Sequence, residues 1–139
     1  MKTIKQSFMI FMILFVASLS QYAGAEVPAK YNLDNQLEKV SEISKYNFMS
    51  WDKVDNQSFI LQTGPSDYYL IVLSSPSDRL AYSETISIPD TNAMVKPGYN
   101  NVIIKGNGFK DTCIINRIYR FKDSEQIKDI KTQLTGKTN

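Results

Sequence analysis

The chain has 139 residues, a formal net charge of +2, one cysteine and no histidine. The lack of histidine excludes Ser-His-Asp and Cys-His catalysis and the usual zinc sites, and a single cysteine cannot form an internal disulfide. The small net charge argues against nucleic acid and anionic lipid as partners, because positive charge drives both kinds of binding.

Residues 1–25 have the pattern of a cleavable signal peptide. Two lysines precede the apolar run 8–17, and Ala23-Gly24-Ala25 supplies the small residues that signal peptidase requires. The apolar run is about half as long as the roughly 20 residues of a membrane-spanning helix. We therefore expect cleavage after Ala25, with no membrane anchor retained. Cleavage leaves 114 residues, enough for one domain, in which 14 basic residues balance 14 acidic ones.

Residues 26–44 contain an apolar repeat that favours a helix. The repeat has spacings of four, three and three positions, which suit one helical face. The alternative is a partly ordered N-terminal arm. The repeat consists of Leu33, Leu37, Val40 and Ile43.

The β domain is predicted at 45–122, where short β-prone runs alternate with turn residues. The run 68–73 is the most apolar and predicts a central strand covered on both faces, whereas 84–88 alternates polar and apolar residues as a half-buried strand does. Glycine, proline, asparagine and aspartate mark the turns between runs. Six strands are predicted, at 46–51, 58–63, 68–73, 84–88, 101–105 and 112–121.

A C-terminal helix is predicted at 123–135. Asp123 is a suitable N-cap, Gln126 follows three positions later as in a capping box, and Gly136 ends the helix. Six short strands and tight turns predict a mainly β fold, a small antiparallel barrel or sandwich, with this helix capping one open end. The apolar stripe that would face the core is Ile127, Ile130 and Leu134.

Few residues are candidates for chemistry. Cys113 has no base beside it in the sequence and is expected to be a buried, unreactive thiol. Asp52 and Asp55, three positions apart, could form an acid–base pair or a calcium site. The ligand series of a calcium loop is missing, so we interpret them as turn residues. The same interpretation covers Asp67, Asp78 and Asp90.

One group of aromatic and basic residues could form a stacking platform for single-stranded nucleic acid. The balanced charge and expected export argue against it, and aromatic residues at β-prone positions usually pack in a core. We predict no catalytic, metal-binding or cofactor-binding residues and no nucleic-acid partner. The group consists of Trp51, Tyr68, Tyr69, Tyr119, Arg117 and Arg120.

Residues 46–120 resemble domain of unknown function 6491, a family of small exported bacterial proteins. The likeness is carried by three stretches, Phe48…Trp51-Asp52…Asp55, Tyr69-Leu70…Leu73…Pro76…Leu80 and Cys113-Ile114-Ile115…Ile118. It implies a signal peptide, a compact β domain, a location in a Gram-negative envelope and no known activity. Relatives often have two cysteines. One matches Cys113, and the other falls at Ser77, which implies that these two residues are close in space.

The leading functional hypothesis is a non-enzymatic periplasmic binding or interaction module, with an unidentified envelope protein or ligand as its partner. One alternative is an inhibitor of an envelope-attacking enzyme, which would insert the predicted loop Pro89–Gly98 into a cleft of its target. The other is a hydrolase that uses carboxylates alone, which would need two carboxylates converging in one cavity. The oligomeric state stays open.

Overall fold

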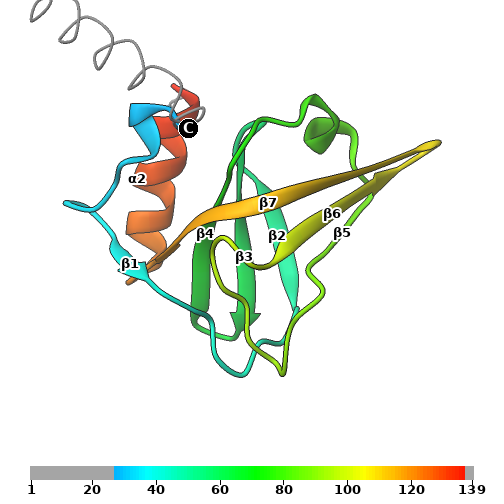
Figure 1. The fold of residues 1–139 in the computed structure, drawn as a ribbon. Coiled ribbons are helices and arrows are strands. Elements are labelled where there is room, and N and C mark those ends of the chain that lie inside the picture. The colour runs from blue at the N-terminus through cyan, green and yellow to red at the C-terminus, as the bar shows by residue number, and fades with distance from the viewer. Residues whose placement is uncertain (1–26, 137–139) are drawn as a thin grey trace, which may run out of the picture.

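A computed structural model describes residues 27–136 of the chain (Figure 1). The predicted signal peptide, residues 1–25, lies outside the described residues. Within them, seven antiparallel strands form one curled sheet that resembles half of a barrel, and a single α-helix follows the last strand. The predicted mainly β fold is therefore confirmed, with one strand more than expected.

The strands follow the predicted order along the chain, and most boundaries shift by a few residues. The predicted strand 46–51 begins late, at Ser50, and residues 46–49 form no strand. The strands are β1 (Glu38–Val40), β2 (Ser50–Lys53), β3 (Ser58–Gly64), β4 (Asp67–Leu73), β5 (Thr85–Ser87), β6 (Asn101–Gly106) and β7 (Phe109–Arg120).

The long strand β7 organises the sheet, whose order is β2-β3-β4-β7-β6-β5. Residues 115–120 of β7 pair with β4, residues 109–114 pair with β6, and residues 118–120 also pair with β1. One strand thus joins both halves of the sheet. The β6–β7 hairpin projects beyond the rest of the molecule (Figure 1).

Strands β3 and β4 are buried on both faces, as predicted for the run 68–73. Phe59, Leu61 and Ile71 face the inside of the curl, where the larger apolar cluster lies. Ile60 and Leu70 alternate with them and join a second cluster on the outer face. Both clusters are needed to cover this part of the sheet.

The C-terminal helix α2 (Ser124–Thr135) begins and ends as predicted. The Asp123 carboxylate accepts a hydrogen bond from Gln126 N at 2.8 Å, and Gly136 ends the helix at φ +67°. Its position differs from the prediction. Ile130 and Leu134 join the outer cluster, so α2 covers the outer face of the sheet and does not close an open end (Figure 1).

The predicted N-terminal helix is wrong. The segment instead forms a 3₁₀ turn at Ala29–Tyr31, then turns, then β1. Leu33 and Leu37 lie in the outer cluster, whereas Ile43 lies in the inner one. These apolar residues are therefore buried on two faces of the sheet, because the chain crosses from one face to the other where β1 pairs with β7. Tertiary burial, not one helical face, accounts for their spacing.

Candidate functional site

The loop that links β5 to β6 is the predicted loop Pro89–Gly98, and it is folded down onto the sheet. Val95 is buried in the inner cluster, whereas residues 89–93 are exposed. The loop thus presents a short tip on the surface and does not hang free.

The side chain of Asn100 holds the two ends of this loop together. Its amide oxygen accepts a hydrogen bond from Lys96 N at 2.7 Å, and its amide nitrogen donates to the Pro89 carbonyl at 3.0 Å. Asn100 is buried, so these bonds replace contacts with water that the amide has lost. The loop is consequently rigid at its base.

A second segment crosses the loop from the N-terminal side. Ile43 and Val95 exchange backbone hydrogen bonds of 2.8 and 3.1 Å, and Tyr46 N donates to the Ala93 carbonyl at 2.8 Å. Lys96 and Glu42 add an ion pair at 3.7 Å. We call residues 42–46 and 89–100 the junction.

Backbone strain is concentrated at the junction. Lys45, Asn92 and Ala93 have φ angles of 54°, 54° and 57°, and they are the only non-glycine residues with positive φ among residues 27–136. Asn92 and Ala93 form the tip of a two-residue turn, in which Thr91 and Met94 exchange hydrogen bonds of 3.0 Å. Asparagine tolerates this conformation, but the second position of such a turn usually holds glycine. Strain of this kind is found most often at functional sites.

The junction also contains an unsatisfied polar group. The hydroxyl of Tyr46 is buried and has no hydrogen-bond partner, which is true of no other buried side-chain polar atom in the described part of the chain. Burial, and then the nearby Asp90 carboxylate, raise the pKa of Tyr46 to about 12. Leaving such a group without a protein partner costs stability.

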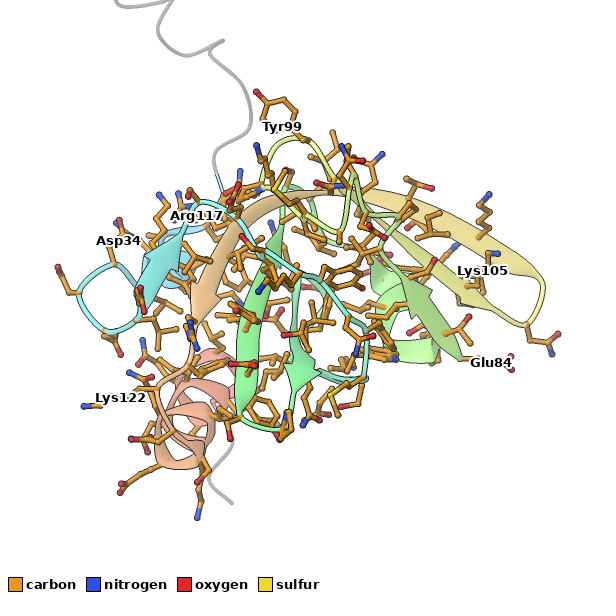
Figure 2. The ribbon with its side chains drawn as sticks, turned by 90° about the horizontal axis from the view of Figure 1, so that it is seen from below. Asp34, Glu84, Tyr99, Lys105, Arg117 and Lys122 are labelled. Carbon is orange, nitrogen blue, oxygen red and sulfur yellow. The ribbon has the colours of Figure 1, made fainter. Side chains whose placement is uncertain are left out.

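A cavity of about 260 Å³ opens beside the loop. Tyr99 stands at its edge with 83% of its surface exposed. Figure 2 shows the ring at the outer end of the loop, pointing away from the sheet. The cavity is lined by Thr91, Met94, Lys96, Tyr99 and Asn100.

Two larger hollows lie at the other end of the molecule, on either side of Phe121 and Lys122. Their volumes are about 400 and 460 Å³. They adjoin the start of α2, whose first turn is already capped by Asp123. No left-handed residue and no unpaired buried group lies there, so the junction is the stronger candidate.

Cys113 is buried, as predicted. Burial, and then the charge of Asp111, raise the pKa of its thiol, so the thiolate needed for nucleophilic attack is disfavoured. Ser77 is also buried, and its hydroxyl donates to Asp111 Oδ2 at 2.7 Å. Asp111 and Cys113 are two residues apart on one face of β7.

Asp52 and Asp55 bind different partners and form no acid–base pair. Asp52 pairs with Lys131 at 2.6 Å, whereas Asp55 accepts hydrogen bonds from Gln57 N and the Tyr31 hydroxyl at 2.9 and 2.7 Å. Asp55 therefore stabilises its own turn and fixes the N-terminal segment. Burial alone would raise the pKa of Asp55, but these bonds, with those from Ser58 and Lys30, hold it below its usual value.

The other predicted turn aspartates make local contacts. Asp90 accepts a hydrogen bond from Ala93 N at 2.7 Å, inside the junction, and Asp67 pairs with Arg120 at 3.1 Å. Asp78 opens a 3₁₀ turn, Asp78–Tyr82. Among residues 27–136, no group of three or more His, Cys, Asp or Glu side chains is placed to hold a metal ion.

The six aromatic and basic residues considered as a nucleic-acid platform do not come together. Trp51 and Tyr69 belong to the inner cluster, and Tyr68 and Tyr119 to the outer one. Trp51 packs edge-on against Phe59, with ring centres 6.1 Å apart. The aromatic residues therefore serve the core on opposite faces of the sheet.

Sequence reasoning singled out the loop of the junction but missed Tyr46 and Tyr99. The predicted loop Pro89–Gly98 ends at a glycine, and the exposed Tyr99 follows it. Nothing in the sequence indicated that residues 42–46 cross this loop, because that contact spans about fifty positions.

The matched sequence places this β-rich chain in a family of unknown function. The chain matches the family of unknown function DUF6491 over residues 1–138 and belongs to that family. No curated protein and no solved structure matches it. No helix among residues 27–136 is long and apolar enough to cross a membrane.

Proposed function

We propose that this protein is exported to the periplasm, where it acts as a non-enzymatic binding or interaction module that uses the junction to hold its partner. The observation that carries the proposal is the strain at the junction. Asn92 and Ala93, two of the three left-handed non-glycine residues, lie between Thr91 and Met94 of the cavity lining, to which the exposed Tyr99 also belongs. A rigid loop of this kind loses little conformational freedom on binding.

Export has a direct test. The pattern of residues 1–25 predicts a mature chain that begins at Glu26. Cells expressing the full-length chain are fractionated, and the intact mass of the protein is measured in each fraction. A protein that retains residues 1–25, or that stays in the cytoplasm, would contradict the proposal.

The binding role is tested by crosslinking in cells. A photoreactive phenylalanine analogue replaces Tyr99 in one variant and Tyr82 in another. Tyr82 is a matched control, because it is 78% exposed but lies in the 3₁₀ turn Asp78–Tyr82, outside the junction. We expect a discrete crosslinked species from position 99 alone. Equal products from both positions, or none from either, would count against a binding surface at the junction.

An inhibitor remains a second candidate, because the exposed tip 90–93 is held in one shape by hydrogen bonds to its base. Ala93 N donates to Asp90 Oδ2, and Thr91 and Met94 bond across the turn. Such a tip could enter the cleft of a lytic enzyme. The purified protein should then slow cell-wall hydrolysis in proportion to its concentration, and Thr91→Arg should abolish the effect.

A hydrolase that uses carboxylates alone has less support. It needs two carboxylates in one cavity. Of the three cavities described above, one contains Glu38 and another Asp123, which already caps α2. None of these three cavities therefore brings two carboxylates together.

A further inference from the structure

The cavity at the junction has room for one small ring. At about 260 Å³, the cavity is slightly smaller than the roughly 300 Å³ at which sites for drug-sized ligands begin. Its size therefore suits a single ring or the end of a chain of rings.

The lining carries one charge, that of Lys96, which a carboxylate outside the lining offsets. Lys96 contributes the one ammonium group, and the Glu42 carboxylate lies 3.7 Å from it. A charged ligand would lose hydration without gaining an unpaired counter-charge. An uncharged ligand with hydrogen-bonding groups carries no such penalty.

The chemistry of the lining has two parts. The ring of Tyr99 offers a flat apolar face that is open to solvent (Figure 2). Thr91, Lys96 and Asn100, whose side chains carry a hydroxyl, an ammonium and an amide, line the same cavity. The Asn100 amide has two N–H groups, and one of them is bound to the Pro89 carbonyl. This lining suits a ligand that has one apolar face and a polar rim.

We infer that the cavity beside Tyr99 binds an uncharged sugar ring, an assignment that rests on the proposed binding role of the junction. A pyranose presents C–H groups on one face, which stack on Tyr99. Its hydroxyls lie around the edge, within reach of Thr91 and Asn100. The hydrogen bonds of the Asn100 side chain keep this lining in place before the ligand arrives.

The test is a titration of the purified, ¹⁵N-labelled protein with glucose, galactose and N-acetylglucosamine, and with glucuronate as the charged counterpart. At least one neutral sugar should produce saturating shifts of the backbone amides of Thr91, Lys96 and Asn100. Tyr99→Ala should weaken binding roughly tenfold, in line with the loss of one stacking contact. Tyr82→Ala should leave affinity unchanged within about twofold, and glucuronate should bind more weakly.

Three results would overturn the assignment: no saturating shift with any neutral sugar, shifts centred away from the junction, or equal losses for the two tyrosine variants. Tyr99 is exposed, so its replacement leaves the core intact, and dispersed amide signals verify this. If no sugar binds but the crosslink from position 99 persists, the sugar assignment fails while the binding role stands. If neither sugar binding nor the crosslink from position 99 is observed, both the sugar assignment and the binding role of the junction are wrong.

Discussion

Tyr46 and Ala93 are joined by a backbone hydrogen bond of 2.8 Å that connects two segments nearly fifty positions apart. The bond holds Ala93 in a left-handed conformation, φ 57°, which a side chain with a Cβ atom adopts at a cost. The tip of the loop is therefore kept in shape by a contact from outside the loop.

Ala93→Gly should stabilise the protein. Glycine removes a left-handed penalty of about 1–2 kcal/mol and loses about 0.5–1 kcal/mol in chain entropy, so a net gain of about 0.5–1 kcal/mol is expected. Urea denaturation measures it. The control is Ala81→Gly, at an exposed position of ordinary φ, which should lose about 0.5–1 kcal/mol. A loss at both positions would mean that Ala93 is unstrained.

Tyr46→Phe should also be stabilising, because it removes a buried hydroxyl that has no partner. The expected gain is about 1 kcal/mol, the lower end of the penalty for an unsatisfied group. Tyr119→Phe is the contrasting variant, since the Tyr119 hydroxyl accepts from Leu33 N at 3.1 Å and donates to Asp34. It should lose stability. A decrease for Tyr46→Phe would indicate that its hydroxyl is satisfied in solution.

The Tyr46 hydroxyl also gives a pH dependence. Its folded pKa of about 12 lies above the usual value of about 10, so the folded state resists ionisation. Below pH ~10 the hydroxyl is neutral in both states and stability does not depend on its titration, but stability falls as the pH rises toward 12. The stability of Tyr46→Phe should therefore fall less steeply than that of the wild type between pH ~10 and 12. Unfolding followed by circular dichroism at each pH measures this.

The sequence predicted the strands of the sheet more accurately than the segments that pack around them. Strands 58–63 and 68–73 were located closely because Ile60 and Leu70 alternate with residues of the other face within one short run. The N-terminal spacing of Leu33 and Ile43 is helical, yet the two residues are buried on opposite faces. An apolar repeat indicates that its residues are buried, but it does not indicate which part of the protein buries them. The Tyr46 contact was equally invisible, because it depends on where two loops cross.

Asp55 should make the fold sensitive to acid. Its folded pKa is held below the usual value, so it stabilises the protein above the unfolded pKa of about 3.9 and loses this effect as the pH falls through the folded pKa. Asp55→Asn should cost about 1.5–3 kcal/mol near neutral pH. The variant should also show a flatter loss of stability below pH ~4. If the stability of the wild type and of Asp55→Asn falls equally steeply below pH ~4, this role of Asp55 is wrong.

Leu70→Ala tests the doubly covered centre of the sheet. Leu70 is fully buried on the outer face, where α2 packs. The substitution should cost about 2–5 kcal/mol through lost contacts and the cavity that remains. Ile114→Ala is the control, because Ile114 is half exposed, and it should change stability by less than about 0.5 kcal/mol. Equal effects would place β4 outside the core.

The closeness of Ser77 and Cys113, implied by the family resemblance, stays a prediction. Ser77 bonds to Asp111 at 2.7 Å, and Asp111 lies on the same face of β7 as Cys113, two residues away. A disulfide requires Cα atoms roughly 4.4–6.8 Å apart. Ser77→Cys should therefore form a bridge with Cys113 when the protein is produced in an oxidising compartment.

Closing this loop should stabilise the oxidised variant by roughly 3–4 kcal/mol in the chain-entropy model, less any strain. Thiol titration and intact mass report the bridge, and urea denaturation reports its energy. Two controls separate the effects. Ser77→Ala removes only the bond to Asp111 and should cost about 1 kcal/mol, like the reduced Ser77→Cys protein. Ser66→Cys, placed beside the hollows near α2, should keep both thiols free. Two free thiols in Ser77→Cys under oxidising conditions would mean that the cysteine pattern of the relatives does not apply to this chain.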